Sequence, residues 1–128
     1  MSKATTNPEE LTGEKIYDYA VEAGTTLSGA DKTTISQLIE VFQSEPNAVD
    51  ACHLIILHIV RQSARGEIPR HGASILVKHL NQFYQSFKTD SEKLAQTVLK
   101  YLTLVKWVRE SGPRGPLNTF QKFVESIR

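Results

Sequence analysis

The sequence predicts an all-α protein, a compact bundle of five to six helices around a buried central helix. Three observations support this prediction. Apolar residues recur at three- and four-residue spacing in most segments, and no segment alternates apolar and polar residues as a half-buried strand does. Proline and glycine fall mostly between these segments, where helices end. Because 128 residues are enough for one core, we expect a single helical domain over residues 1–128.

The first two predicted helices lie in the acidic part of the chain. The first begins near Pro8, with Asn7 as its N-cap, and ends at Gly24. Residues 1–7 are then a disordered tail. The second helix spans about residues 33–44, and its apolar positions follow the amphipathic spacing i, i+3, i+4, i+7: Ile35, Leu38, Ile39 and Phe42.

The third predicted helix follows Pro46 and runs to about Arg65, just before Gly66. Asn47 is its predicted N-cap. Its middle, residues 54–60, is apolar on nearly all sides. A helix of that kind is usually buried on every side, so we expect this helix at the centre of the bundle.

Three further helices are predicted after the glycine at position 66. The fourth runs from about Pro69 or His71 to Phe87. Residues 89–92, Thr-Asp-Ser-Glu, are typical of a capping box and open the fifth helix, which ends at residues 111–113. Residues 112–117, rich in glycine and proline, form a linker to a short C-terminal helix that starts near Asn118.

The composition limits the possible compartments. Cys52 is the only cysteine, which excludes an intramolecular disulfide, and we interpret it as a small core residue. The longest apolar run, residues 51–60, is about half of the ~20 residues that a membrane helix needs. No apolar stretch follows the N-terminus, as it would in a secretory signal. We therefore expect a cytoplasmic protein without a membrane partner.

Residues that could carry catalysis or bind a metal are few and poorly spaced. His53 and His58 are five residues apart, so on a helix they diverge by about 140°. His71 and His79 could share a helix face, but with no carboxylate nearby they make a weak metal site. Cys52 and His53 are adjacent and diverge, which argues against a nucleophile–base pair. We interpret the histidines as structural or surface residues, and we expect no catalytic residue, no metal and no cofactor.

The basic residues are the most informative set. Residues 1–50 hold three lysines against nine acidic residues, whereas residues 51–128 hold twelve basic against five acidic residues. Arg61 and Arg65 share a face at the end of the third helix, and Arg70 follows across the turn. These arginines either bind nucleic-acid phosphates or complement the negative end of the helix dipole. Secondary candidates for phosphate contacts are Lys78, Lys100, Lys106 and Arg109.

Three stretches resemble the small subunit of type III CRISPR–Cas effector complexes. Residues 33–38, Thr-Thr-Ile-Ser-Gln-Leu, resemble the opening of an early helix in that family. The apolar helix that ends at residues 61–65 resembles the family's central helix with its closing arginine, and residues 99–112 resemble its long later helix. The resemblance covers about residues 30–112. The chain departs from the family at Ile39, where the family often has an arginine, and so lacks one expected phosphate contact.

The resemblance implies a role in antiviral defence. The chain would be a non-catalytic, RNA-backbone-binding subunit of a CRISPR-type ribonucleoprotein, holding guide or target RNA beside larger subunits. From the uneven charge distribution, we further expect several copies to stack head to tail. The alternative is a helical protein–protein adaptor or regulatory subunit that binds no nucleic acid, and the third possibility is a small enzyme with a scattered site.

Overall fold

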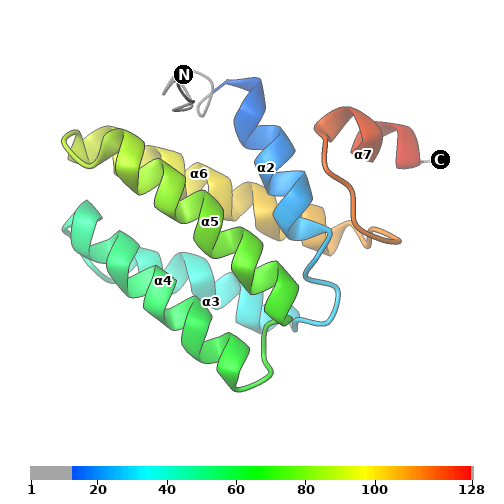
Figure 1. Ribbon diagram of the computed structural model, residues 1–128, viewed down its shortest axis with the longest axis horizontal. Coiled ribbons are helices and arrows are strands. Elements are labelled where there is room, and N and C mark those ends of the chain that lie inside the picture. The colour runs from blue at the N-terminus through cyan, green and yellow to red at the C-terminus, as the bar shows by residue number, and fades with distance from the viewer. Residues whose placement is uncertain (1–12, 128) are drawn as a thin grey trace, which may run out of the picture.

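A computed structural model describes residues 13–127, most of which lie in six helices (Figure 1). The helices are α2 (Glu14–Gly24), α3 (Lys32–Gln43), α4 (Ala48–Ala64), α5 (Arg70–Phe87), α6 (Ser91–Glu110) and α7 (Phe120–Ser126). No strand lies within residues 13–127, which confirms the predicted all-α bundle. The predicted disordered tail, the N-cap Asn7 and the helix start near Pro8 lie outside the described residues.

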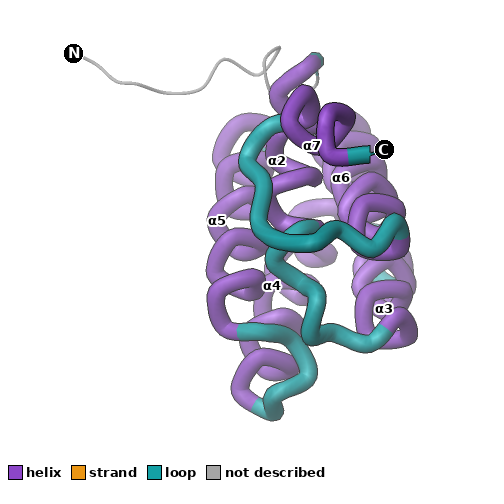
Figure 2. The backbone as a smooth tube through the Cα atoms, turned by 90° about the vertical axis from the view of Figure 1, so that its right-hand side faces the viewer, coloured by secondary structure: helices purple, strands orange, loops and turns teal. Residues whose placement is uncertain are grey.

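The helices form two layers. In Figures 1 and 2, α4 and α5 run side by side in one layer with α2 at its upper edge, and α3 and α6 lie behind them. Helix α6 packs against α2, α3, α4 and α5, so it occupies the centre of the bundle. Its inward face is buried along its whole length, from Leu94 to Val108.

Side chains cap two of these helices. The Asn47 side-chain oxygen accepts a hydrogen bond from the Asp50 amide at 3.0 Å, which confirms Asn47 as the N-cap of α4. At the start of α6, Asp90 accepts from the Lys93 amide at 3.1 Å. The N-cap is therefore Asp90 and not Thr89, the residue that the capping-box pattern predicts.

The prediction that the helix between Pro46 and about Arg65 lies at the centre of the bundle is wrong. Helix α4 lies at the edge of the bundle, and its outer face exposes three apolar side chains, of which Leu57 is the most open at 67%. Only the opposite face, with Ile55 and Ile59, is fully buried. Within the described part of the chain, no helix combines the length and the apolar character that crossing a bilayer requires.

The C-terminal helix α7 is attached to the bundle by a few polar contacts and one ring contact. The Leu117 amide donates to the Thr25 hydroxyl at 2.9 Å, and the Phe120 amide donates to the Asp18 carboxylate at 2.7 Å. The rings of Phe120 and Tyr17 meet edge to face at 5.5 Å. None of the residues of α7 is buried, so this helix adds little to the core.

Candidate nucleic-acid interface

A tight turn between α4 and α5 positions the predicted arginine corner. The Glu67 amide donates to the Gln62 carbonyl at 2.8 Å, and the Gly66 amide donates to the Ser63 carbonyl at 3.0 Å. This pair of bonds is a Schellman motif, which requires a left-handed residue after the helix. Gly66 supplies it with φ of 80°. The chain then reverses within a few residues, and α5 begins at Arg70.

The three arginines of this corner are exposed and unpaired. Arg61, Arg65 and Arg70 are all solvent-exposed, and within residues 13–127 no carboxylate lies within ion-pair distance of any of them. The segment that joins them, residues 61–70, contains a single acidic residue, Glu67. The α4–α5 corner therefore carries a local excess of positive charge that no internal partner neutralises.

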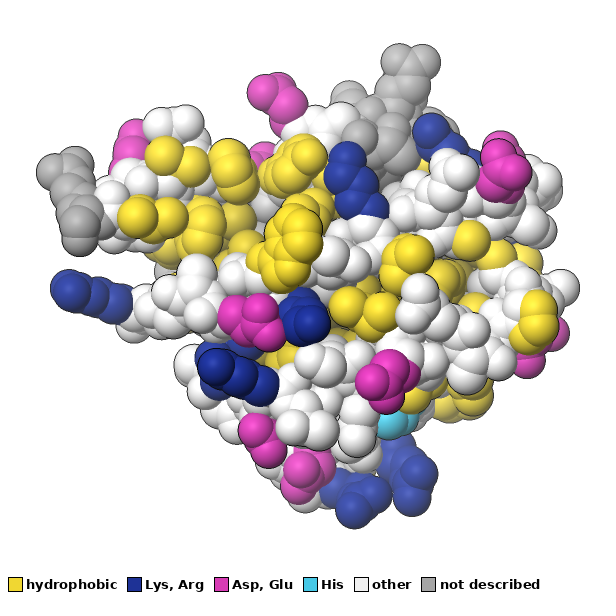
Figure 3. Space-filling view, turned by 180° about the vertical axis from the view of Figure 1, so that it is seen from behind, with side chains coloured by type: hydrophobic (Ala, Val, Ile, Leu, Met, Phe, Trp, Pro, Cys, Tyr) yellow, Lys and Arg dark blue, Asp and Glu magenta, His cyan; other side chains and the backbone are white. Residues whose placement is uncertain are grey.

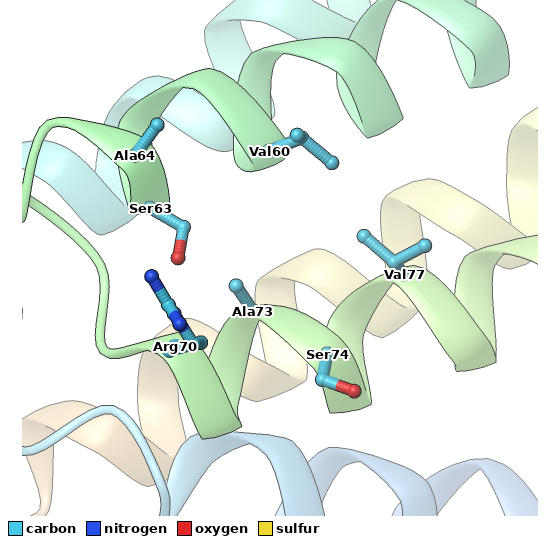
Figure 4. Close-up of a pocket in the computed structure, with 7 residues that line it drawn as sticks. All are labelled: Val60, Ser63, Ala64, Arg70, Ala73, Ser74 and Val77. Carbon is cyan, nitrogen blue, oxygen red and sulfur yellow. The ribbon is translucent and has the colours of Figure 1, made fainter.

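Arg70 lines a groove between α4 and α5. The groove has a volume of about 370 Å³ and is lined by Val60, Ser63, Ala64, Arg70, Ala73, Ser74 and Val77. Figure 4 shows the Arg70 and Ser63 side chains pointing toward each other near the α4–α5 turn, with Val60 and Val77 facing each other farther along. The groove thus combines an apolar floor with one guanidinium and two hydroxyl groups.

Arg61 and Arg65 lie beside the groove rather than in it. Arg61 follows Val60 by about 100° around the helix axis, and Arg65 lies one turn farther along on the same face. Burial and the positive charge of Arg61 both lower the pKa of His58. The structure therefore places Arg70 in the groove and the other two arginines on the neighbouring face of α4.

The secondary lysines are dispersed. Lys78 is exposed on α5, whereas Lys106 is half-buried on α6. The Lys100 ammonium lies 5.1 Å from the centre of the Tyr17 ring, which is a cation–π contact within the protein. On the face drawn in Figure 3, lysines and arginines alternate with acidic side chains. Lys100 and Lys106 thus belong to α6, whereas Lys78 lies on α5, the helix that begins at Arg70.

Arg109 has a structural role, so we remove it from the candidate phosphate contacts. Its Nε atom donates to the Leu27 carbonyl at 2.9 Å, and its Nη2 atom donates to the Ala30 carbonyl at 2.8 Å and to the Ser28 carbonyl at 3.3 Å. The guanidinium therefore holds the loop between α2 and α3 against α6. Three of the five N–H donors of this guanidinium are used by carbonyls, which leaves only the two on Nη1 for a phosphate.

A buried polar network lies in the core, and it was not predicted from the sequence. His79, which is 1% exposed, accepts a hydrogen bond at Nδ1 from the Tyr101 hydroxyl at 2.7 Å. Its Nε2 atom donates to the Glu22 carboxylate at 2.8 Å, and the Tyr19 ring stacks on the imidazole at 4.1 Å. In the sequence, His79 lies between the inward-facing residues Leu76 and Phe83, and this spacing was the available sign that its side chain is buried.

The electrostatics of this network favour a neutral imidazole. Burial lowers the pKa of His79 to about 4, and it outweighs the opposing effect of Glu22. A second proton on Nδ1 would also leave the Tyr101 hydroxyl without an acceptor, since His79 is its hydrogen-bond partner. Because the imidazole and the hydroxyl are both buried, no substrate reaches them, and the network stabilises the fold.

Other reactive groups in the described residues are equally enclosed or isolated. Cys52 is fully buried, and burial raises the pKa of its thiol to about 11, so the thiol stays protonated. Within residues 13–127, no three His, Cys, Asp or Glu side chains gather closely enough to hold a metal ion. The exposed feature with the clearest binding chemistry is therefore the α4–α5 corner.

No protein-family model, no curated protein and no solved structure matches this chain.

Proposed function

We propose that this chain is a non-catalytic, RNA-backbone-binding protein, the small helical subunit of a type III CRISPR–Cas effector complex. Arg61, Arg65 and Arg70 contact phosphates of guide or target RNA, and Lys78 extends the contact along α5. Larger subunits of the same cytoplasmic complex carry the chemistry. Copies of this chain stack head to tail, so that the arginine corners follow the RNA strand.

The observation that supports this proposal is the set of unpaired arginines at one corner. Like charges that gather without an acidic partner destabilise a fold by repulsion, and a bound anion removes that cost. Guanidinium groups can each hold two phosphate oxygens, and here none of the three is used within the described part of the chain. No base-reading motif accompanies the arginines, so the contact is to the RNA backbone.

The test measures RNA affinity at several salt concentrations. We compare the parent with Arg61→Ala, Arg65→Ala, Arg70→Ala and the triple variant, using fluorescently labelled single-stranded RNAs of unrelated sequence. Each single variant should bind about tenfold more weakly for every sequence. The negative slope of log affinity against log salt should become shallower by about 0.7 for each arginine–phosphate contact that a substitution removes, which is the value for single strands.

Arg114→Ala is the matched control, because Arg114 is an exposed arginine that belongs to neither α4 nor α5. It should bind RNA like the parent. A triple variant that is folded by circular dichroism and still binds RNA as tightly as the parent contradicts the proposal. Purification of the native assembly tests the assignment to a complex, which requires that RNA and larger subunits accompany the chain.

A second candidate function rests on a different surface. Trp107 is 61% exposed on α6, and it lines a hollow of about 470 Å³ with Tyr17, Leu99 and Leu104. Figure 3 shows hydrophobic side chains gathered on the face of the molecule opposite to that seen in Figure 1. Exposed tryptophan beside apolar residues is typical of protein–protein interfaces, which favours an adaptor or regulatory subunit. If Trp107→Ala abolishes assembly while the triple arginine variant assembles normally without RNA, the adaptor function is the correct one.

A further inference from the structure

The groove between α4 and α5 has unused polar groups of the kind that bind a nucleotide. The hydroxyls of Ser63 and Ser74 and the guanidinium of Arg70 have no hydrogen-bond partner within the described residues. Donors and acceptors therefore surround a floor of Val60, Ala73 and Val77.

We propose that this groove receives the ribose and base of one unpaired nucleotide of the bound RNA. Arg70 holds the phosphate of that nucleotide, the apolar floor packs against its sugar and base, and the Ser63 hydroxyl binds its 2′-hydroxyl. This inference rests on the proposed function, and it adds that the corner selects single-stranded RNA over duplex and over DNA.

The size and shape of the groove support one nucleotide. Its volume of about 370 Å³ is near the lower end of small-ligand sites, which span roughly 300–1,000 Å³. A base in an A-form duplex is stacked and paired, so it cannot enter a groove between two helices. A base in a single strand can turn outward at little cost, and this is how most proteins recognise RNA specifically.

The chemistry of the lining supports ribose over deoxyribose. A 2′-hydroxyl both donates and accepts hydrogen bonds, as does the Ser63 hydroxyl. Ser63 and Arg70 point toward each other in Figure 4, so a phosphate on Arg70 lies next to the Ser63 hydroxyl. DNA lacks the group that the Ser63 hydroxyl binds.

The experiment fills the groove without touching the arginines. Val60 is half-exposed at the groove, so Val60→Trp places a large ring over the floor with little strain on the core. Leu57→Trp is the matched control, because Leu57 is exposed on the same helix and does not line the groove. We measure the affinity of each folded variant for a single-stranded RNA, for the same sequence as DNA and for an RNA duplex.

The parent should bind single-stranded RNA about tenfold more tightly than duplex or DNA, and Val60→Trp should remove that preference. Duplex affinity should stay unchanged in Val60→Trp, since the arginines remain, and Leu57→Trp should behave like the parent. If Val60→Trp does not fold, Ser63→Ala replaces it, and it should reduce the preference for RNA over DNA. If Val60→Trp and Ser63→Ala keep the parent's preference for single-stranded RNA while Arg70→Ala weakens RNA binding, no nucleotide enters the groove and the proposed function stands. If the arginine variants have no effect either, both proposals are wrong.

Discussion

Replacing Tyr101 with phenylalanine removes one atom from the buried network and should destabilise the protein. The ring keeps its edge-to-face packing against Phe83 at 5.0 Å, so no cavity of consequence forms. The loss is the hydroxyl that donates to His79 at 2.7 Å. His79 Nδ1 is then a buried acceptor without a donor, which costs about 1–3 kcal/mol.

Urea denaturation at pH 7, followed by circular dichroism, measures this cost. With a slope of about 2 kcal/mol per molar urea, the midpoint should fall by roughly 0.5–1.5 M. Tyr84→Phe is the matched control, because Tyr84 is half-buried and packs its ring on His53, but its hydroxyl has no hydrogen-bond partner within the described residues. Its midpoint should barely move. If the two variants differ by less than about 0.5 kcal/mol, the network does not stabilise the fold as we describe.

Three further predictions concern the same core and the edge of the bundle. The pKa of His79 is lowered to about 4, so at acidic pH the unfolded state binds a proton that the native state excludes. The free energy of unfolding should therefore be unchanged above about pH 6.5 and about 3 kcal/mol lower at pH 4. In urea titrations at several pH values, His79→Gln should show a weaker dependence on pH. Leu57→Ala should cost less than about 0.5 kcal/mol, whereas Ile59→Ala, at a fully buried position on the same helix, should cost about 2–5 kcal/mol. Arg109→Ala should lower the thermal midpoint of unfolding, because three carbonyls lose their donor. Arg109→Lys should not restore the midpoint, since an ammonium cannot reproduce the fork geometry of a guanidinium. The RNA affinity of folded Arg109→Ala should be unchanged.

Local features of the fold could be predicted from the sequence. Asn47 before α4 and Gly66 after it are short-range signals, and both have the expected role. The placement of α4 could not be predicted in the same way. Apolar character on all sides indicates which residues can be buried, but which faces are covered depends on where neighbouring helices pack. Here α4 is at an edge, so Leu57 stays exposed while Ile59 is covered.

The roles of Arg109 and His79 depend on residues far away in the chain. Arg109 binds carbonyls of residues 27–30, and His79 joins Glu22 to Tyr101. No spacing rule connects such positions, since the contacts arise only when the helices pack. The arginine corner was easier to predict because Arg61, Arg65 and Arg70 lie within ten residues around a single turn.

The weak attachment of α7 gives the protein two separate levels of stability. Opening this segment breaks the bonds from Leu117 to Thr25 and from Phe120 to Asp18 and exposes no core residue from α7. Such an opening requires much less free energy than global unfolding. Amide protons of α7 should therefore exchange with solvent long before those of α6, and a protease that cuts after the glycine-rich segment should leave the other helices packed. Residues 13–127 thus consist of a cooperative five-helix unit and a terminal segment that opens independently.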